Sequence, residues 1–118
     1  MTSSGMSIEE LRAFVLSLEG VEESSHHGKP DFRVQGKIVV NLDERDQTVT
    51  IKLSPEEQSA LVTRDDPAIS LPGGWAKHGW TTFSLPLVDP DEMRELITDG
   101  WEQSRPAKGR AARPPRLR

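Results

Sequence analysis

Apolar and polar residues alternate with a period of two along the middle of the chain. The apolar positions are Phe32, Val34, Ile38, Val40, Leu42, Val49, Ile51 and Leu53. Because successive side chains of a strand point to opposite faces, this alternation predicts three antiparallel strands with one buried face. Gln35-Gly36 and the polar residues 43–47 supply the two turns. The opposite face would carry Arg33, Val39, Asn41, Thr48, Thr50 and Lys52.

Three segments around this region show the signals of a helix start. Each has a capping residue followed three positions later by a glutamate, as in a capping box: Ser7 with Glu10, Ser54 with Glu57, and Asp89 with Glu92. Pro55 and Pro90 follow their caps at the first helical position, where a missing N–H costs nothing. We therefore expect helices to begin at residues 8, 55 and 90.

The first and last helices carry apolar stripes at helical spacing, which should pack on the sheet. These stripes are Ile8, Leu11, Phe14, Val15 and Leu18, and then Met93, Leu96, Ile97 and Trp101. Gly20 stands where a left-handed residue would end the first helix. A further strand pair, residues 69–71 and 80–85, brackets the loop 72–79. The order helix, three strands, helix, two strands, helix predicts a two-layer α+β domain, an antiparallel sheet packed by helices.

The net charge of -4 hides an uneven distribution along the chain. The last fifteen residues hold six basic residues and no acidic one: Arg105, Lys108, Arg110, Arg113, Arg116 and Arg118. Residues 1–103 therefore carry a net charge of -10. We expect residues 1–103 to form one domain and residues 104–118 a basic, flexible tail. The acidic body is a poor general attractant for nucleic acid, but the tail could supply that attraction.

The composition excludes several classes of protein. The chain has no cysteine, which removes disulfides, thiol catalysis and cysteine-ligated metals. The first twenty residues carry Glu9, Glu10 and Glu19 within their apolar pattern and do not form a signal peptide. No stretch is apolar for long enough to span a membrane. We expect a soluble cytoplasmic protein that needs no metal or cofactor.

The stretch SSHHGKPDFRV holds the adjacent residues His26 and His27. Side chains of neighbouring residues in an extended segment point to opposite faces, so the pair is poorly placed to chelate one ion. No serine or carboxylate stands at a recognisable catalytic offset from either histidine. The following Gly28, Lys29 and Pro30 lack the other residues of a phosphate-binding loop. We therefore expect this stretch to form a bend between two extended segments of the chain.

The three tryptophans differ in context. Trp101 belongs to an apolar stripe and Trp80 begins a strand, so both are expected in the core. Trp75 lies in a glycine-rich loop with Lys77 and His78. It is either an exposed aromatic beside positive charge, suited to stacking on bases, or an indole folded over the edge of the core.

The element order and several short stretches together resemble the MmcQ/YjbR family over about residues 7–103. The stretches are GVEE at Gly20, HGKPDFRV at His27, GK at Gly36, IKLSPE at Ile51 and GW at Gly79. This resemblance implies a bacterial protein with a compact α+β domain similar to the secretion-chaperone fold. Members are commonly labelled DNA-binding, with two strand hairpins acting as wings, and the resemblance implies no enzymatic activity.

The family signature falls here on Gly28, Lys29, Pro30, Phe32, Arg33, Gly36, Lys37, Lys52 and Trp80. The fold has no evident need for the four basic residues among these. We therefore expect Lys29, Arg33, Lys37 and Lys52 to form one basic strip that contacts the phosphates of double-stranded DNA. Trp75, Lys77 and His78 would extend that surface, and the basic tail would add affinity without sequence preference.

Two other functions remain open. The acidic body also suits a chaperone-like protein-interaction module that holds a protein partner or a second copy on its exposed sheet face or a helix face. A third possibility is a small-molecule pocket beneath the loop 72–79.

Overall fold

The computed structural model describes residues 5–26 and 28–104. Its helices and strands in chain order are α1 (Ile8–Leu16), β1 (Val21–His26), β2 (Lys29–Val34), β3 (Lys37–Asp43), β4 (Thr48–Lys52), α2 (Pro55–Thr63), β5 (Ile69–Ser70), the 3-10 helix η1 (Gly73–His78), β6 (Trp80–Ser84) and α3 (Pro90–Ser104). The prediction of three strands before the middle helix is one short, because β1 is also a strand. Four polar residues in a row, Glu22 to Ser25, give β1 no apolar alternation, and they are exposed at the edge of the sheet.

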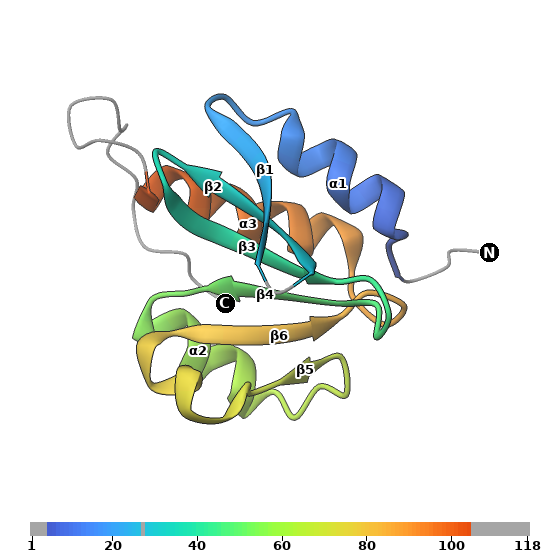
Figure 1. Ribbon diagram of the computed structural model, residues 1–118. Coiled ribbons are helices and arrows are strands. Elements are labelled where there is room, and N and C mark those ends of the chain that lie inside the picture. Colours follow the sequence, from blue (N-terminus) through green and yellow to red (C-terminus); the bar gives the residue numbers. More distant parts are fainter. Residues whose placement is uncertain (1–4, 27, 105–118) are drawn as a thin grey trace.

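The six strands form one antiparallel sheet in the order β1-β2-β3-β4-β6-β5. Figure 1 shows α3 running behind the middle strands, with α1 on the same side and α2 beside the β6–β5 end. The closest helix contacts are α3 with β3 and β4, α1 with β1, and α2 with β5. The predicted α+β fold, an antiparallel sheet packed by helices, is confirmed.

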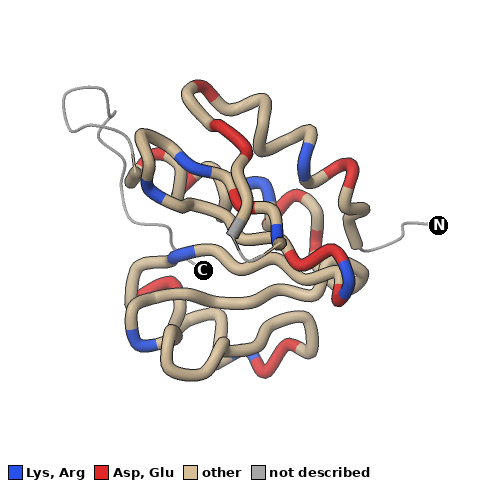
Figure 2. The backbone as a smooth tube through the Cα atoms, in the orientation of Figure 1, with Lys and Arg blue, Asp and Glu red and all other residues tan. Residues whose placement is uncertain are grey.

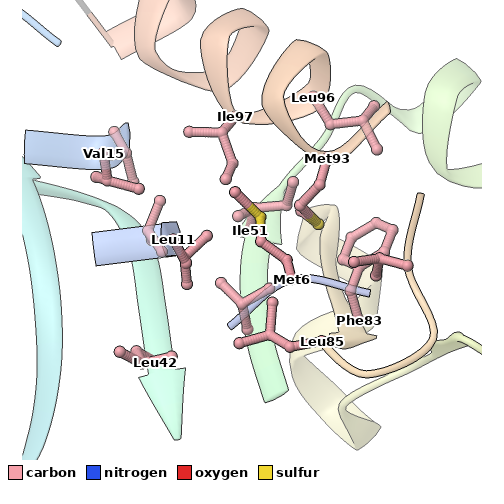
Figure 3. Packing of buried hydrophobic residues seen from close by; sticks show 14 of the residues in the cluster. Met6, Leu11, Val15, Leu42, Ile51, Phe83, Leu85, Met93, Leu96 and Ile97 are labelled. Carbon is pink, nitrogen blue, oxygen red and sulfur yellow. The ribbon is translucent and has the colours of Figure 1, made fainter. Parts of the chain in front are cut away.

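The core lies between the sheet and the helices. Its fully buried side chains include Leu11 and Val15 of α1, Ile51 of β4, and Leu96 and Ile97 of α3. Figure 3 shows these residues converging from the different elements, with Met6 reaching in from the segment before α1. Trp101 is only partly buried against this core, and its indole Nε1 donates a hydrogen bond of 2.7 Å to the Glu19 carbonyl oxygen.

A β-bulge changes the expected assignment of faces on β3. Phe32 pairs with Val40, but the next residue of β2, Arg33, pairs with Ile38, so Val39 is an extra residue. A bulge lets two successive residues depart from strict alternation. Val39, expected on the exposed face, is therefore 5% exposed, and Ile38 rather than Val39 shares the outward side with Arg33.

The three predicted helix starts form in three different ways. Ser7 and Glu10 make a complete capping box. The Ser54 hydroxyl accepts a hydrogen bond of 3.1 Å from the Glu57 amide and donates one of 3.4 Å to the Glu57 carboxylate. Asp89 accepts from the Asp91 amide at 3.0 Å. Glu92, three residues after Asp89, forms an ion pair of 2.7 Å with Arg64, the C-cap residue of α2.

The ends of α1 and α3 also differ from the expectation. α1 ends at Leu16 with Ser17 as C-cap, and Gly20 takes its positive φ of 80° only in the turn before β1. α3 continues through Ser104, and the remaining residues of the predicted flexible tail lie outside the described residues. No helix in the described ranges has the length and apolar character needed to cross a membrane.

Candidate nucleic-acid interface

The nine basic residues in the described part of the chain separate into two groups. Five of them have a carboxylate partner within 4.0 Å: Arg12, Lys29, Arg33, Arg64 and Arg94. Lys37, Arg45, Lys52 and Lys77 form no salt bridge within residues 5–26 and 28–104. Two of the predicted phosphate-binding residues, Lys29 and Arg33, thus belong to the paired group, and two, Lys37 and Lys52, do not.

Arg33 is held by a buried carboxylate on its own strand. Its Nε and one terminal guanidinium nitrogen donate to the two oxygens of Asp31 at 2.9 and 3.1 Å. The two side chains lie two residues apart on β2 and so point to the same, outward face of the sheet. Hydrogen bonding to Asp31 raises the pKa of Arg33. This bidentate geometry occupies two of the five N–H donors of the guanidinium and leaves fewer for a phosphate.

Lys29 lies away from the other predicted cations. It begins β2, whereas Arg33 is near the end of the same strand. Its ammonium nitrogen is 2.9 Å from the Asp43 carboxylate at the end of β3. Asp43 also accepts a hydrogen bond of 3.0 Å from the Asp46 amide, and these two contacts hold its pKa below the usual range, the amide having the larger effect. The four predicted cations therefore do not form one continuous strip.

Lys37, Lys52 and Lys77 gather at one end of the sheet. Lys37 pairs with Val34 beside the turn from β2 to β3, and Lys52 pairs with Trp80, where β4 ends and β6 begins. η1, which contains Lys77, leads directly into β6. Neighbouring strands are roughly 5 Å apart, so these elements place three cations at one end of the sheet. The register puts Lys37 on the face of the buried Val34 and Lys52 on the outward face with Thr50, so the two lysines flank this end from opposite faces. Figure 2 shows basic positions at this end, on the left of the view. We call Lys37, Lys52 and Lys77 the basic sheet end.

The loop 72–79 is fixed to the basic sheet end by close backbone contacts. Gly79 has a φ of 94°, and a Cβ atom there would collide with the Leu53 carbonyl oxygen. The Gly79 carbonyl oxygen in turn accepts a hydrogen bond of 2.9 Å from the Leu53 amide. From α2, the side-chain amide of Gln58 donates to the Ala76 and Trp80 carbonyl oxygens at 2.9 and 3.2 Å. The loop is thus anchored both at Leu53, directly after β4, and at α2.

Trp75 is an exposed aromatic side chain on this anchored loop. It is 66% exposed, and its ring centroid lies 6.4 Å from that of His78 at a tilted angle of 57°. The alternative that its indole covers the edge of the core is therefore wrong. Trp75, Lys77 and His78 all belong to η1, which places an aromatic face next to the basic sheet end.

Carboxylates limit the size of the positive region. Glu56 and Glu57 occupy the first turn of α2, shortly after Lys52. The outward face of the sheet is close to neutral, because Arg33 and Lys29 are matched there by Asp31 and Asp43. The rest of that face includes a hydrogen bond of 2.8 Å between the Thr50 and Thr82 hydroxyls. The basic sheet end is therefore a local feature on an acidic molecule.

The sequence interpretation missed the two carboxylates that pair with its predicted cations. Asp31 was detectable, because residues i and i+2 of a strand share a face and Asp31 precedes Arg33 by two. The contact between Lys29 and Asp43 depends on how β2 and β3 are aligned, which no local pattern contains. His27 and the side chain of His26, the histidine pair considered in the sequence, lie outside the described residues.

Comparison with known proteins agrees on the fold. A family model described as YjbR matches residues 16–103. A crystal structure of a Deinococcus radiodurans protein, whose domain is described as DUF419, superposes with a TM-score of 0.75 at 17% sequence identity. The similarity covers 87% of this chain and 81% of that chain. No curated protein matches the sequence.

Proposed function

This chain belongs to the YjbR family, and we propose that it is a non-enzymatic, cytoplasmic nucleic-acid-binding module that contacts the phosphates of double-stranded DNA with its basic sheet end. The observation that carries the proposal is that Lys37, Lys52 and Lys77 lie on adjoining elements and have no salt bridge within the described residues. An ammonium group without a carboxylate partner can bind a phosphate without first breaking an internal ion pair.

The proposal assigns different roles to the seven residues singled out in the sequence. Lys37, Lys52 and Lys77 bind phosphates, and Trp75 and His78 contact sugars or bases from the adjacent loop. Arg33 contributes only through the part of its guanidinium that Asp31 leaves exposed. Lys29 lies at the opposite end of β2 and is not part of the interface.

The acidic body does not prevent this contact. Charges beyond a Debye length of about 10 Å are largely screened at ordinary ionic strength, so a phosphate responds mainly to the nearest side chains. Glu56 and Glu57 lie near Lys52 in the sequence and reduce the attraction there. We therefore expect weak binding that depends strongly on salt.

A mobility-shift titration on duplex DNA tests the proposal. Three phosphate contacts give a log-log dependence of affinity on salt with a slope of about -2.7. The six basic residues after position 104 should steepen that slope further, and a chain ending at Ser104 should bind more weakly but still bind. Absence of a shift by the full chain at about 50 mM salt would reject nucleic-acid binding.

A protein partner is the second candidate function, and the outward sheet face favours it. The ion pairs Arg33–Asp31 and Lys29–Asp43 and the Thr50–Thr82 hydrogen bond leave this face polar and nearly neutral, which suits a protein surface better than a polyanion. A stoichiometric partner recovered by pull-down in the presence of nuclease, and lost when Thr50 is replaced by arginine, would favour this candidate.

A further inference from the structure

A cavity of about 580 Å³ opens on the opposite side of β6 from the middle of the sheet, where α2 ends and α3 begins. Its volume lies within the range of pockets that hold small organic ligands, about 300–1,000 Å³. It is separate from the loop 72–79, under which the sequence suggested a pocket. It also shares no residue with the basic sheet end.

The floor of the cavity is apolar. Phe83 of β6 and Met93 and Leu96 of α3 line it, and each of these side chains is at most 2% exposed. Figure 3 shows Met93 and Leu96 on the α3 side of Phe83. Leu87, by contrast, lines the cavity while remaining half exposed, so it stands at the mouth. An apolar group entering the cavity would therefore contact mainly Leu87 and the partly exposed Ile69, which lie above this buried floor.

The rim of the cavity is acidic. It carries one basic residue, Arg64, and four acidic residues: Asp66, Asp89, Asp91 and Glu92. The guanidinium of Arg64 is engaged by Glu92 at 2.7 and 3.1 Å and by Asp66 at 3.0 Å. Arg64 is therefore paired with two carboxylates. Arg94, which lies outside the lining, pairs with Asp91 at 3.2 Å, so the four rim carboxylates exceed their two arginine partners by two charges.

From this combination we propose that the cavity binds a small amphipathic cation, with its apolar body against Leu87 and Ile69 above the buried floor and its ammonium group at the carboxylates of the rim. A carboxylate of the same size would be repelled by the rim, and its natural counterion, Arg64, is already paired. A neutral analogue would gain only the apolar contacts. The site is independent of nucleic-acid binding, because the two surfaces use different residues.

Three probes of equal size and different charge test this proposal: phenylbutylamine, phenylbutanol and phenylbutyrate. Each is titrated into the full chain and followed by amide NMR shifts. We expect shifts at Ala68, Leu87 and Met93, with a Kd for the amine of about 0.1–1 mM. The carboxylate should bind at least about tenfold more weakly than the amine, with the alcohol between them.

Two matched substitutions separate the cavity from the general surface. Leu87→Lys places an ammonium group of the chain itself at the mouth and should weaken the amine at least about tenfold. Leu16→Lys makes the same change in charge at another exposed leucine, on α1 and outside the cavity, and should leave the amine affinity unchanged. Shifts that avoid the cavity residues, equal affinity for amine and carboxylate, or equal effects of the two substitutions would each overturn the proposal.

Discussion

Asp31 and Arg33, two residues apart on β2, form a bidentate ion pair in which the carboxylate is fully buried and 33% of the arginine side chain remains exposed. An arginine that was expected from the sequence to contact a phosphate is thus bound to an acid of its own strand. Removing one member of such a pair leaves the other without its counter-charge, which is more costly than removing both. The pair therefore has a structural role that must be separated from any role in binding.

The first prediction concerns this pair. Arg33→Met should lower the thermal midpoint by several degrees, because it leaves the Asp31 carboxylate buried and unpaired. The double variant Asp31→Asn, Arg33→Met should recover part of that loss, since no buried charge remains. Thermal unfolding followed by circular dichroism measures both. Equal midpoints for the single and double variants would mean that Arg33 does not compensate Asp31.

The basic sheet end is tested by paired neutral substitutions. Replacing Lys37 and Lys52 together by glutamine should reduce the log-log salt slope of DNA binding by about two, because two phosphate contacts are lost. Arg45→Gln is the control, since Arg45 also has no salt bridge in the described part of the chain but lies in the turn from β3 to β4, at the opposite end of the sheet. For each charge removed, the lysine variant should lose more DNA affinity than Arg45→Gln. If Arg45→Gln weakens binding as much as the loss of either lysine does, the interface lies elsewhere on the molecule.

A third prediction uses the exposure of Trp75. Trp75→Ala should change stability by no more than about 0.5 kcal/mol, because the side chain contributes little to the core. It should weaken nucleic-acid binding by about 1 kcal/mol or more while leaving the salt slope unchanged, because stacking is not an ionic contact. The same titration used for the lysine variants gives both quantities. A fall in the salt slope would contradict a stacking role.

The ion pair of Asp43 predicts a specific dependence of stability on pH. Its pKa in the folded protein is lowered from 3.8, mainly by the Asp46 amide and then by Lys29. As the pH falls, the unfolded chain binds the proton near pH 3.8, whereas the folded chain binds it only at a lower pH. The stabilisation is therefore present above pH 3.8 and is lost as the pH falls through the lower pKa of the folded protein. Asp43→Asn should be less stable than the parent at about pH 6, and the difference should shrink toward about pH 2. If the stability difference between Asp43→Asn and the parent stayed constant over this pH range, the charge of Asp43 would not be its cause.

The final prediction concerns the junction between η1 and β6. Gly79→Ala should destabilise the fold by about 2–4 kcal/mol, because alanine is strained at positive φ and its Cβ would meet the Leu53 carbonyl. Gly74→Ala is the matched control in the same loop, where φ is not positive and no atom lies within 4 Å of the added carbon. Chemical denaturation compares the two. Similar losses would show that the loop tolerates no substitution, whatever the local geometry.

Local patterns in the sequence determined most of the elements. The alternation in β2 to β4, the capping residues Ser7, Ser54 and Asp89, and the apolar stripe of α3 each depend on residues close together in the chain. Such signals act within one turn or one strand, so they can be read without knowing the fold. The one strand that the pattern missed, β1, is stabilised by backbone pairing with β2 rather than by burial of its side chains.

Tertiary structure alone decided which charged groups of different elements meet. The bulge at Val39 alters which β3 side chains are buried, and the alignment of β2 with β3 brings Lys29 to Asp43. The fold also brings Arg64, at the end of α2, to Glu92 in the first turn of α3. Charge pairing between different elements depends on distances of a few ångströms between segments that are remote in the chain. Local sequence patterns do not determine these distances. For that reason the sequence specified the fold of this YjbR protein but not which of its cations remain available to a ligand.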